Sequence, residues 1–330
     1  MTNTEMEIRG TYDALKKAIE YKPDFEMIKE IMDNSKKIIF LGCGSSYHLS
    51  TTLSHFVKRY SKKETHHIIG SEALLSLESN LVDFSNSVVF AFSRSGETTE
   101  TIRAAEILKD KSLPLIGVTC EKDSTLSKIS DVAIIVPSKE KSVVMTQSFT
   151  ATLLAMEKMF LEISGIDTEF FKEQVEFSKY ILDESFDFFE SMDLSNIEHV
   201  VFLGTGENWG LANEGALKVK EMTITYSESH STLDYRHGPK ALATENTIVI
   251  IQTEEDEKDF VKNLRQELES YGAKVVEIGY KKDVDILKDF GRGKSTPLRV
   301  IPIQVFAMIL AKVKAVNPDS PRNLTKVVKL

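Results

Sequence analysis

The sequence predicts an α/β protein built from two tandem, doubly wound domains with parallel sheets and flanking helices. Short apolar runs without alternation, such as Lys37–Leu41 and Ser87–Phe92, are typical of strands buried on both faces of a parallel sheet. Segments with helical spacing separate these runs, and strands that alternate with helices favour a doubly wound sheet. The pattern then repeats, since Leu41 and Leu203 occupy matching places 162 residues apart. We infer an internal duplication.

Each expected element follows from a local pattern. Residues 6–32 have helical spacing, and Lys22–Pro23–Asp24 divides them into two helices. Residues 99–109 predict a helix, and residues 146–194 predict two helices broken near residues 164–167. The remaining expected strands are the apolar runs at Leu115–Thr119, Asp131–Val136, His199–Leu203, Thr247–Ile251 and Ala273–Ile278.

The length of 330 residues suits two domains of moderate size. Hydrophobic residues make up 42% and charged residues 28%, which is an ordinary globular balance. The expected organisation is N-terminal helices over 1–35, a first sheet domain over 36–165, a helical linker over 166–194, and a second sheet domain with a C-terminal tail over 195–330.

Charge and composition exclude several classes of function. The chain has 41 Lys and Arg against 50 Asp and Glu, so a net charge of −9 argues against a nucleic-acid partner. No apolar run long enough to predict a membrane span or a signal peptide is present. Cys43 and Cys120 fit neither a disulfide framework nor a zinc site, which favours the cytoplasm. No metal is expected and no cofactor, because Gly42-x-Gly44 lacks the third glycine of a dinucleotide fingerprint.

The two copies differ where ligands of a parallel sheet gather, at the carboxyl ends of the strands. In the first copy the turn Ser93–Thr98, here called the phosphate cradle, offers a glycine and three hydroxyls (Ser93, Ser95 and Thr98) before a helix N-terminus. Taken alone, such a turn is more often a plain helix N-cap, in which Ser or Thr satisfies free backbone donors. Ser46, at the end of another strand of the same sheet, favours the anion site. The corresponding acidic turn, Gln252–Glu257, has four carboxylates and is expected to repel phosphate. One phosphorylated ligand per chain follows.

Candidate acid–base groups lie in the second copy. Glu214, Lys218 and Glu221 stand at i, i+4 and i+7, hence on one face of a predicted helix. A solvated stripe of salt bridges gives the same spacing, although small apolar residues between them argue against full exposure. His237 precedes Gly-Pro in a loop and is either a structural hydrogen-bonding group or an acid–base group suited to neutral pH. The polar residues 227–233 that lead to it predict a long exposed loop.

Four motifs in order resemble those of the sugar isomerase (SIS domain) family, especially the isomerase half of glucosamine-6-phosphate synthase. They are Ser93–Thr98, Glu214–Glu221, His237–Pro239 and Pro321–Lys326. The resemblance extends from about residue 30 to the end of the chain, and implies two tandem SIS domains.

The resemblance also implies roles for particular residues. The cradle binds the 6-phosphate, with Ser46 joining the contacts to phosphate and sugar hydroxyls, and Glu221 is the base that moves a proton between C1 and C2. Lys218 is its catalytic neighbour, His237 opens the sugar ring, and Lys326 lies near the substrate carbonyl. Glu214 is expected to contact the substrate. A homodimer or larger homo-oligomer is implied, in which His237 comes from the neighbouring chain.

Two departures shape the expected reaction. The synthase begins with a glutaminase domain that this chain lacks, so glutamine-dependent amination is not expected. Ser-Arg-Ser replaces the usual Ser-Gln-Ser, and Arg94 is expected to reach the phosphate or a sugar hydroxyl. Tyr235–Lys240 and Ser142–Phe149 look closer to AgaS-type amino-sugar-phosphate deaminases and isomerases.

The expected function is therefore an amino-hexose 6-phosphate deaminase/isomerase that needs no metal and yields a ketose 6-phosphate and ammonia. An aldose/ketose 6-phosphate isomerase and a fructosamine-6-phosphate deglycase remain alternatives within this class. A non-catalytic sugar-phosphate sensor is the alternative of another class. It is disfavoured because only about 35 residues precede the first strand, fewer than a DNA-binding domain needs.

Overall fold

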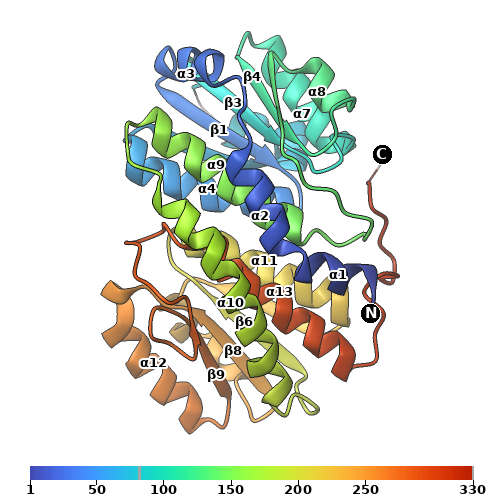
Figure 1. Cartoon of the computed structure of the whole chain (residues 1–330), viewed down its shortest axis with the longest axis vertical. Helices are drawn as coiled ribbons and strands as arrows, with labels where there is room; N and C mark the ends of the chain where they lie inside the picture. The colour runs from blue at the N-terminus through green and yellow to red at the C-terminus, as the bar shows by residue number, and fades with distance from the viewer. Residues whose placement is uncertain (81–82, 329–330) are drawn as a thin grey trace. The chain divides into compact units, whose positions relative to one another are not determined.

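The computed structural model describes residues 1–80 and 83–328 and divides into two compact units. The N-terminal unit comprises Asp13–Glu140, Gln147–Phe171 and Thr325–Leu330. The C-terminal unit comprises Met1–Tyr12, Lys141–Thr146 and Lys172–Leu324. Each unit contains one five-stranded parallel sheet (Figure 1).

In the N-terminal unit the strand order is β2-β1-β3-β4-β5. The central strands are apolar along their whole length because helices cover both faces of the sheet. Ile39, Leu41, Val89 and Ala91 pack in one cluster with apolar residues of α7. The strands are β1 (Lys37–Gly42), β2 (Glu64–Ile69), β3 (Ser87–Phe92), β4 (Leu115–Thr119) and β5 (Val132–Ile135).

The opposite face of this sheet is aromatic. Phe40 and Phe90 of neighbouring strands contact Phe160 of α9, with ring centroids 5.8 and 5.1 Å away. Helices α4 and α9 pack against each other, and α7 lies against β3 (Figure 1). The helices are α2 (Thr11–Glu20), α3 (Phe25–Asp33), α4 (Ser45–Ser61), α5 (Gly70–Leu75), α6 (Leu77–Asn80), α7 (Thr99–Asp110), α8 (Thr125–Ile129) and α9 (Gln147–Ile163).

The C-terminal unit repeats this arrangement with the order β10-β9-β8-β6-β7. Strands β6, β8 and β9 correspond to β1, β3 and β4, as the duplication predicts. One face packs on apolar residues of α12, and on the other Phe202 of β6 contacts Phe306 of α13. The strands are β6 (His199–Leu203), β7 (Tyr226–His230), β8 (Thr247–Gln252), β9 (Lys274–Gly279) and β10 (Val284–Asp285).

Helix α13 lies at the centre of this unit. It is long and apolar enough to cross a membrane by length and composition, but 89% of it is buried, as in the core helix of a folded domain. Helix α11 packs along it, and α1 contacts it (Figure 1). The helices are α1 (Asn3–Arg9), α10 (Phe170–Ser191), α11 (Glu207–Thr223), α12 (Lys258–Ser270) and α13 (Thr296–Val313), with 3₁₀ turns η1 (Asp234–Arg236), η2 (Pro239–Leu242) and η3 (Glu255–Glu257).

The apolar runs predicted the central strands to within one or two residues, and the break between α9 and α10 is confirmed. Two expectations are wrong. The segment after α11, expected to be a long exposed polar loop, contains β7, which pairs in parallel with β6. The N-terminal helical region has a further break, since α1 ends at Arg9 with Gly10 as its C-cap. Strand β2, an edge strand with polar residues, was not anticipated.

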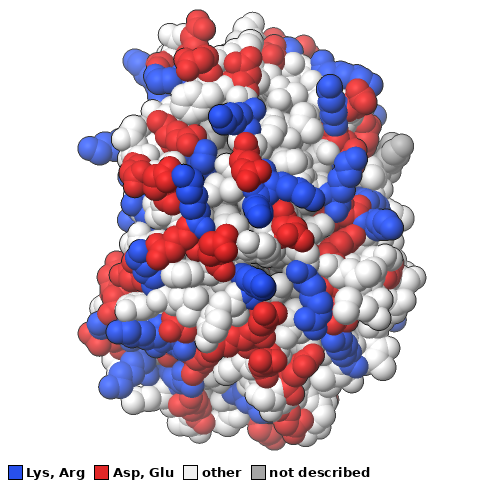
Figure 2. Space-filling model, viewed as in Figure 1, with Lys and Arg blue, Asp and Glu red and all other residues white. Residues whose placement is uncertain are grey.

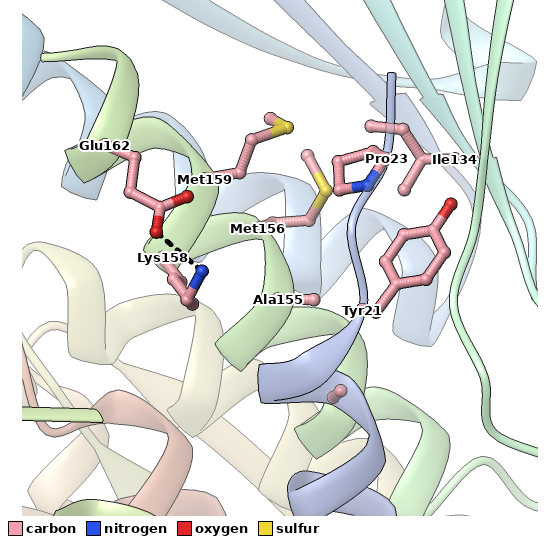
Figure 3. Close-up of a pocket in the computed structure, with 9 residues that line it drawn as sticks. Tyr21, Pro23, Ile134, Ala155, Met156, Lys158, Met159 and Glu162 are labelled. Carbon is pink, nitrogen blue, oxygen red and sulfur yellow. Dashed lines mark hydrogen bonds and ion pairs between the residues drawn. The ribbon is translucent and has the colours of Figure 1, made fainter. Parts of the chain in front are cut away.

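The surface carries many side chains of both charges, in agreement with the 41 Lys and Arg and 50 Asp and Glu of the sequence. Basic and acidic side chains are interspersed over the face of the molecule in Figure 2. A cavity of about 20 Å³ lies beside α9, between Tyr21, Pro23 and Met159 (Figure 3). Its volume admits a water molecule but no sugar.

Candidate active site

The phosphate cradle follows β3 at the carboxyl end of the N-terminal sheet. The Ser93 and Thr98 hydroxyls face each other across the turn, with Oγ and Oγ1 3.1 Å apart. Thr98 occupies the N-cap position of α7, yet its side chain makes no capping hydrogen bond. The simple N-cap explanation therefore does not account for this threonine. Its hydroxyl lies beside the first-turn N–H groups of α7, which have no partners within the helix.

The shape of the cradle depends on Gly96. Its φ of +64° lies in the left-handed region, and a Cβ there would approach Ser124 Oγ to 2.1 Å. The Leu126 N–H donates to the Gly96 carbonyl at 3.0 Å. Glu97 turns its carboxylate away and accepts from Thr125 N at 2.7 Å, so it caps α8. The remaining cradle hydroxyl, Ser95 Oγ, accepts from the Glu97 N–H at 3.2 Å. The backbone is thus fixed by contacts with α8.

Ser46 lies on the strand next to the cradle. It is in the first turn of α4, after Gly44 as the N-cap, and is 8% exposed. Strands β1 and β3 pair in register, with Leu41 opposite Ala91, so both strands end at the same edge. The structure thus brings Ser46 and the cradle to adjacent strand ends, as expected.

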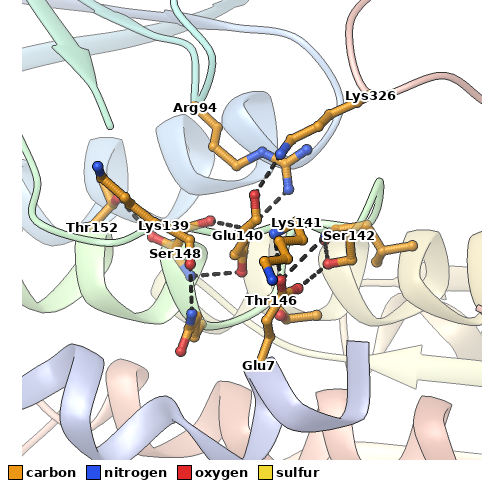
Figure 4. Close-up of polar contacts among 12 residues, drawn as sticks. Glu7, Arg94, Lys139, Glu140, Lys141, Ser142, Thr146, Ser148, Thr152 and Lys326 are labelled. Carbon is orange, nitrogen blue, oxygen red and sulfur yellow. Dashed lines mark hydrogen bonds and ion pairs between the residues drawn. The ribbon is translucent and has the colours of Figure 1, made fainter. Parts of the chain in front are cut away.

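Arg94 and Lys326 both bond to Glu140, a residue that sequence reasoning did not single out (Figure 4). Arg94 Nη1 donates to Glu140 Oε2 at 2.9 Å, and the Arg94 side chain is only 12% exposed. Lys326 Nζ donates to the Glu140 carbonyl oxygen. The tail also meets the cradle, since Thr99 N donates to the Val328 carbonyl at 3.4 Å. No local sequence signal links Glu140 to Arg94 and Lys326, because these two partners are 46 and 186 residues away.

In the C-terminal unit, Glu214, Lys218 and Glu221 form a cluster on α11, here called the α11 ion cluster. Lys218 Nζ lies 3.3 Å from Glu214 Oε1 and also donates to Glu221 Oε2. The side chains of Lys218 and Glu214 are fully buried, whereas that of Glu221 is 20% exposed. The alternative of a solvated stripe is therefore wrong, because α11 packs this face inside the unit.

The charges of the α11 ion cluster support one another. Burial alone would lower the pKa of the Lys218 ammonium, but the Glu214 and Glu221 carboxylates outweigh it and leave the pKa raised. Lys218 therefore stays protonated and cannot accept a proton at neutral pH. Glu221 is the member of the cluster that reaches solvent, which suits it to meet a substrate.

His237 follows the 3₁₀ turn η1 and is exposed. The loop that carries it is anchored on both sides. Tyr235 is fully buried in the core, and burial, reinforced by the Glu228 carboxylate, raises its pKa to about 12. Arg236 pairs with Glu267 of α12 at 2.9 Å, and Lys240 bonds the same carboxylate. The histidine is thus presented on a fixed loop.

Carboxylates of the acidic turn are bonded to partners within the protein. Glu254 accepts from Asn208 Nδ2 at 2.9 Å, from Gly293 N at 3.1 Å and from Arg299 Nη2 at 3.1 Å. The side chains of Glu254 and Arg299 are 5% and 2% exposed. Arg292 bonds Asp256 and Glu257. A carboxylate of the chain itself therefore occupies the carboxyl end of β8.

Comparison with known proteins agrees with this geometry. The model of the SIS domain matches residues 31–162 and 193–291, one match on each sheet. The chain belongs to the SIS domain family. A crystal structure of glucosamine-6-phosphate deaminase from Thermotoga maritima is similar to this SIS domain protein over 100% of both chains, with a TM-score of 0.91 and 38% identity.

Other similarities are more distant. Tagatose-6-phosphate ketose/aldose isomerase from Escherichia coli has a TM-score of 0.83 over 97% of this chain and 95% of its own, but 22% identity, and shows the fold alone. A probable glutamine–fructose-6-phosphate aminotransferase of Acanthamoeba polyphaga mimivirus is 30% identical over 93% of this chain and 53% of its own. The SIS domain protein thus spans about half the length of such curated relatives.

Proposed function

We propose that this SIS domain protein is an amino-hexose 6-phosphate deaminase/isomerase, which converts a hexosamine 6-phosphate into a ketose 6-phosphate and ammonia. The observation that carries this proposal is the similarity to glucosamine-6-phosphate deaminase over the whole of both chains, at 38% identity. Phosphosugar isomerases are the coarser class that the relatives share. Fold alone would not distinguish between these reactions.

The proposed chemistry needs one base, one ring-opening group and water. With His237 assisting ring opening, the sugar exposes an aldehyde at C1. Glu221 removes the proton from C2 and returns it to C1 through an enolamine, which leaves an imine at C2. Water adds to C2, the C–N bond breaks, and ammonia leaves as the C2 ketone forms. General acid–base catalysis of this kind contributes typically 10²–10⁴-fold.

Burial supports the assignment of Glu221 as the base. Lys218 is fully buried between two carboxylates and keeps its charge, and its ammonium donates to the Glu221 carboxylate and so holds it in place. Glu214 is fully buried beside Lys218, which suits it to hold the lysine in place. The cradle hydroxyls supply donors for a phosphate monoester, and neutral hydroxyls bind the dianion without adding a buried charge.

The direct test is ammonia release from a panel of hexosamine 6-phosphates, run beside ketose formation from the corresponding unaminated aldose 6-phosphates. We expect stoichiometric ammonia and ketose 6-phosphate from at least one amino sugar. Ketose formation from unaminated sugars without any ammonia release would instead establish the simple isomerase. Binding without turnover of any member would establish a sensor.

We further propose that the protein is a homodimer in which His237 serves the active site of the neighbouring chain. The exposure of His237 on its anchored loop supports this. Mixing inactive Glu221→Gln and His237→Ala proteins under subunit exchange would give about half hybrid dimers, so about a quarter of wild-type activity is expected. Exchange confirmed by mass spectrometry with no recovery would show that His237 acts within its own chain.

A further inference from the structure

Glu140 is a buried acid that pairs with Arg94 of the cradle. Its side chain is fully buried, and both carboxylate oxygens are bonded: Oε1 accepts from Ser148 N at 3.0 Å, and Oε2 accepts from Ser148 Oγ at 2.5 Å and from Arg94 at 2.9 Å. Figure 4 shows the carboxylate between the arginine of the cradle and the first turn of α9. A buried carboxylate needs such partners, because an unpaired charge is costly away from water.

In this arrangement the guanidinium of Arg94 is bonded to a carboxylate of the protein itself. Its charge is neutralised by Glu140, and its backbone is fixed as well, since the Arg94 carbonyl accepts from Cys120 N at 3.0 Å and Thr119 Oγ1 at 3.2 Å. Arg94 therefore stabilises the conformation of the cradle through bonds at both its backbone and its side chain. Because the ion pair carries no net charge, the cradle itself attracts phosphate mainly through hydroxyls and N–H groups.

Glu140 also reaches the C-terminal tail. Its backbone carbonyl accepts from the ammonium of Lys326, the lysine that the family resemblance places near the substrate carbonyl (Figure 4). One residue thus contacts the cradle through its side chain and the tail lysine through its backbone. Displacement of Glu140 would disturb both at once.

We propose that Glu140 is a positioning residue of the active site, which sets the charge and shape of the cradle through Arg94 and holds Lys326 through its carbonyl. The proposal rests on the proposed function, in which the cradle binds the sugar phosphate. Under this proposal Arg94 stabilises the structure of the cradle and does not itself bind the phosphate.

A double-mutant cycle tests the pair, using Arg94→Gln, Glu140→Gln and the double variant, with inorganic phosphate binding measured by calorimetry. Arg94→Gln removes a positive charge beside Glu140 and makes the surroundings of the cradle more negative, so phosphate affinity should fall about tenfold. Glu140→Gln removes a negative charge beside Arg94, so phosphate should bind more tightly, by up to about tenfold, while kcat falls. The double variant removes both charges and should bind phosphate within about threefold of wild type.

The opposite pattern overturns the proposal. If Arg94 is itself a phosphate ligand, the double variant binds phosphate as weakly as Arg94→Gln alone. Lys109→Gln is the matched control, because it removes one positive charge from the far end of α7, where Lys109 pairs with Asp131. This control should leave phosphate affinity unchanged.

Folding does not limit the test. If a single variant is too unstable for calorimetry, urea denaturation compares it with the double variant, which should be the more stable of the two. A double variant that is no more stable overturns the pairing. The reaction is scored separately: wild-type protein that binds phosphate but releases no ammonia refutes the proposed function, and the binding cycle still tests Glu140.

Discussion

Helices α4 and α11 occupy the same place in the two sheets but carry different chemistry. Both follow the first strand of their copy, both are 17 residues long, and both begin after a glycine with nearly the same backbone angles, φ 54° and ψ −128° at Gly44, φ 60° and ψ −121° at Gly206. The positions that hold the α11 ion cluster correspond in α4 to Thr52, Phe56 and Arg59. The duplicated scaffold therefore carries this ion cluster on α11 and not at the matching positions of α4.

The turns after β3 and β8 also differ between the copies, but here the candidate ligand-binding groups lie in the first copy. The cradle offers hydroxyls around a left-handed glycine, whereas the acidic turn places Glu254 on the buried Arg299 and on Asn208, the residue that corresponds to Ser46. Repulsion by carboxylates is thus only part of the reason to expect one phosphate per chain. In the second copy the Glu254 carboxylate already lies at the end of the strand, where the first copy has the cradle. Under the proposed function, one copy binds the phosphate and the other transfers the proton.

The largest effect is expected from reversing the charge of the cradle. Thr98→Glu should abolish binding of the sugar phosphate by repulsion, and Thr98→Ala should weaken it by about 1–3 kcal/mol, the range for hydrogen bonds to charged groups. Lys258→Ala, at the residue directly after the acidic turn, should leave the dissociation constant unchanged. Competition by unphosphorylated glucosamine as strong as by its 6-phosphate would contradict the cradle assignment.

Removal of the Glu254 carboxylate should destabilise the second copy. Glu254→Ala leaves Arg299 buried without its counter-charge, which should lower the free energy of unfolding by about 3–5 kcal/mol. Acetate, a free carboxylate, should restore part of this stability in urea denaturation. The control Glu255→Ala removes a carboxylate of the same turn that pairs with Lys258 at the surface, and should change stability by less than about 0.5 kcal/mol. Equal losses from both variants would refute the special role of Glu254.

The division of chemistry is tested by Glu221→Gln, which keeps shape and hydrogen bonding but cannot accept a proton. Deuterium exchange at C1 and C2 should fall by at least about 10²-fold, while phosphate binding stays at the wild-type level. Glu269→Gln, an exposed carboxylate on α12, is the control. Exchange at the wild-type rate would assign the base elsewhere, with Glu214 the first residue to test.

The smallest effect concerns the backbone of the cradle. Gly96→Ala places a Cβ against Ser124 and forces a left-handed conformation, so a loss of about 2–3 kcal/mol with weaker phosphate binding is expected. Gly165→Ala, at φ +69° with nothing within 4 Å of the added Cβ, isolates the backbone term and should cost about 1–2 kcal/mol. Thermal denaturation of both variants measures the difference. Equal losses would mean that the contact with Ser124 does not constrain the cradle.

The sequence by itself determined the central strands, the duplication and the position of the cradle. Continuous apolar runs, such as the fully buried Ser87–Phe92, occur where helices cover both faces of a sheet, so local composition is sufficient there. The edge strands were not recognisable in the same way. β7 reads Tyr-Ser-Glu-Ser-His, because one side of an edge strand lacks a neighbouring strand and the segment tolerates polar residues.

Only the tertiary structure decided which charged residues are buried and what they contact. The spacing of Glu214, Lys218 and Glu221 is the same for a solvated stripe and for a buried ion cluster, and the packing of α11 against α13 makes the difference. The Arg94–Glu140 and Glu254–Arg299 pairs join residues 46 and 45 positions apart. No local pattern contains such pairs, because they form only when separate strands and helices meet at one edge of a sheet.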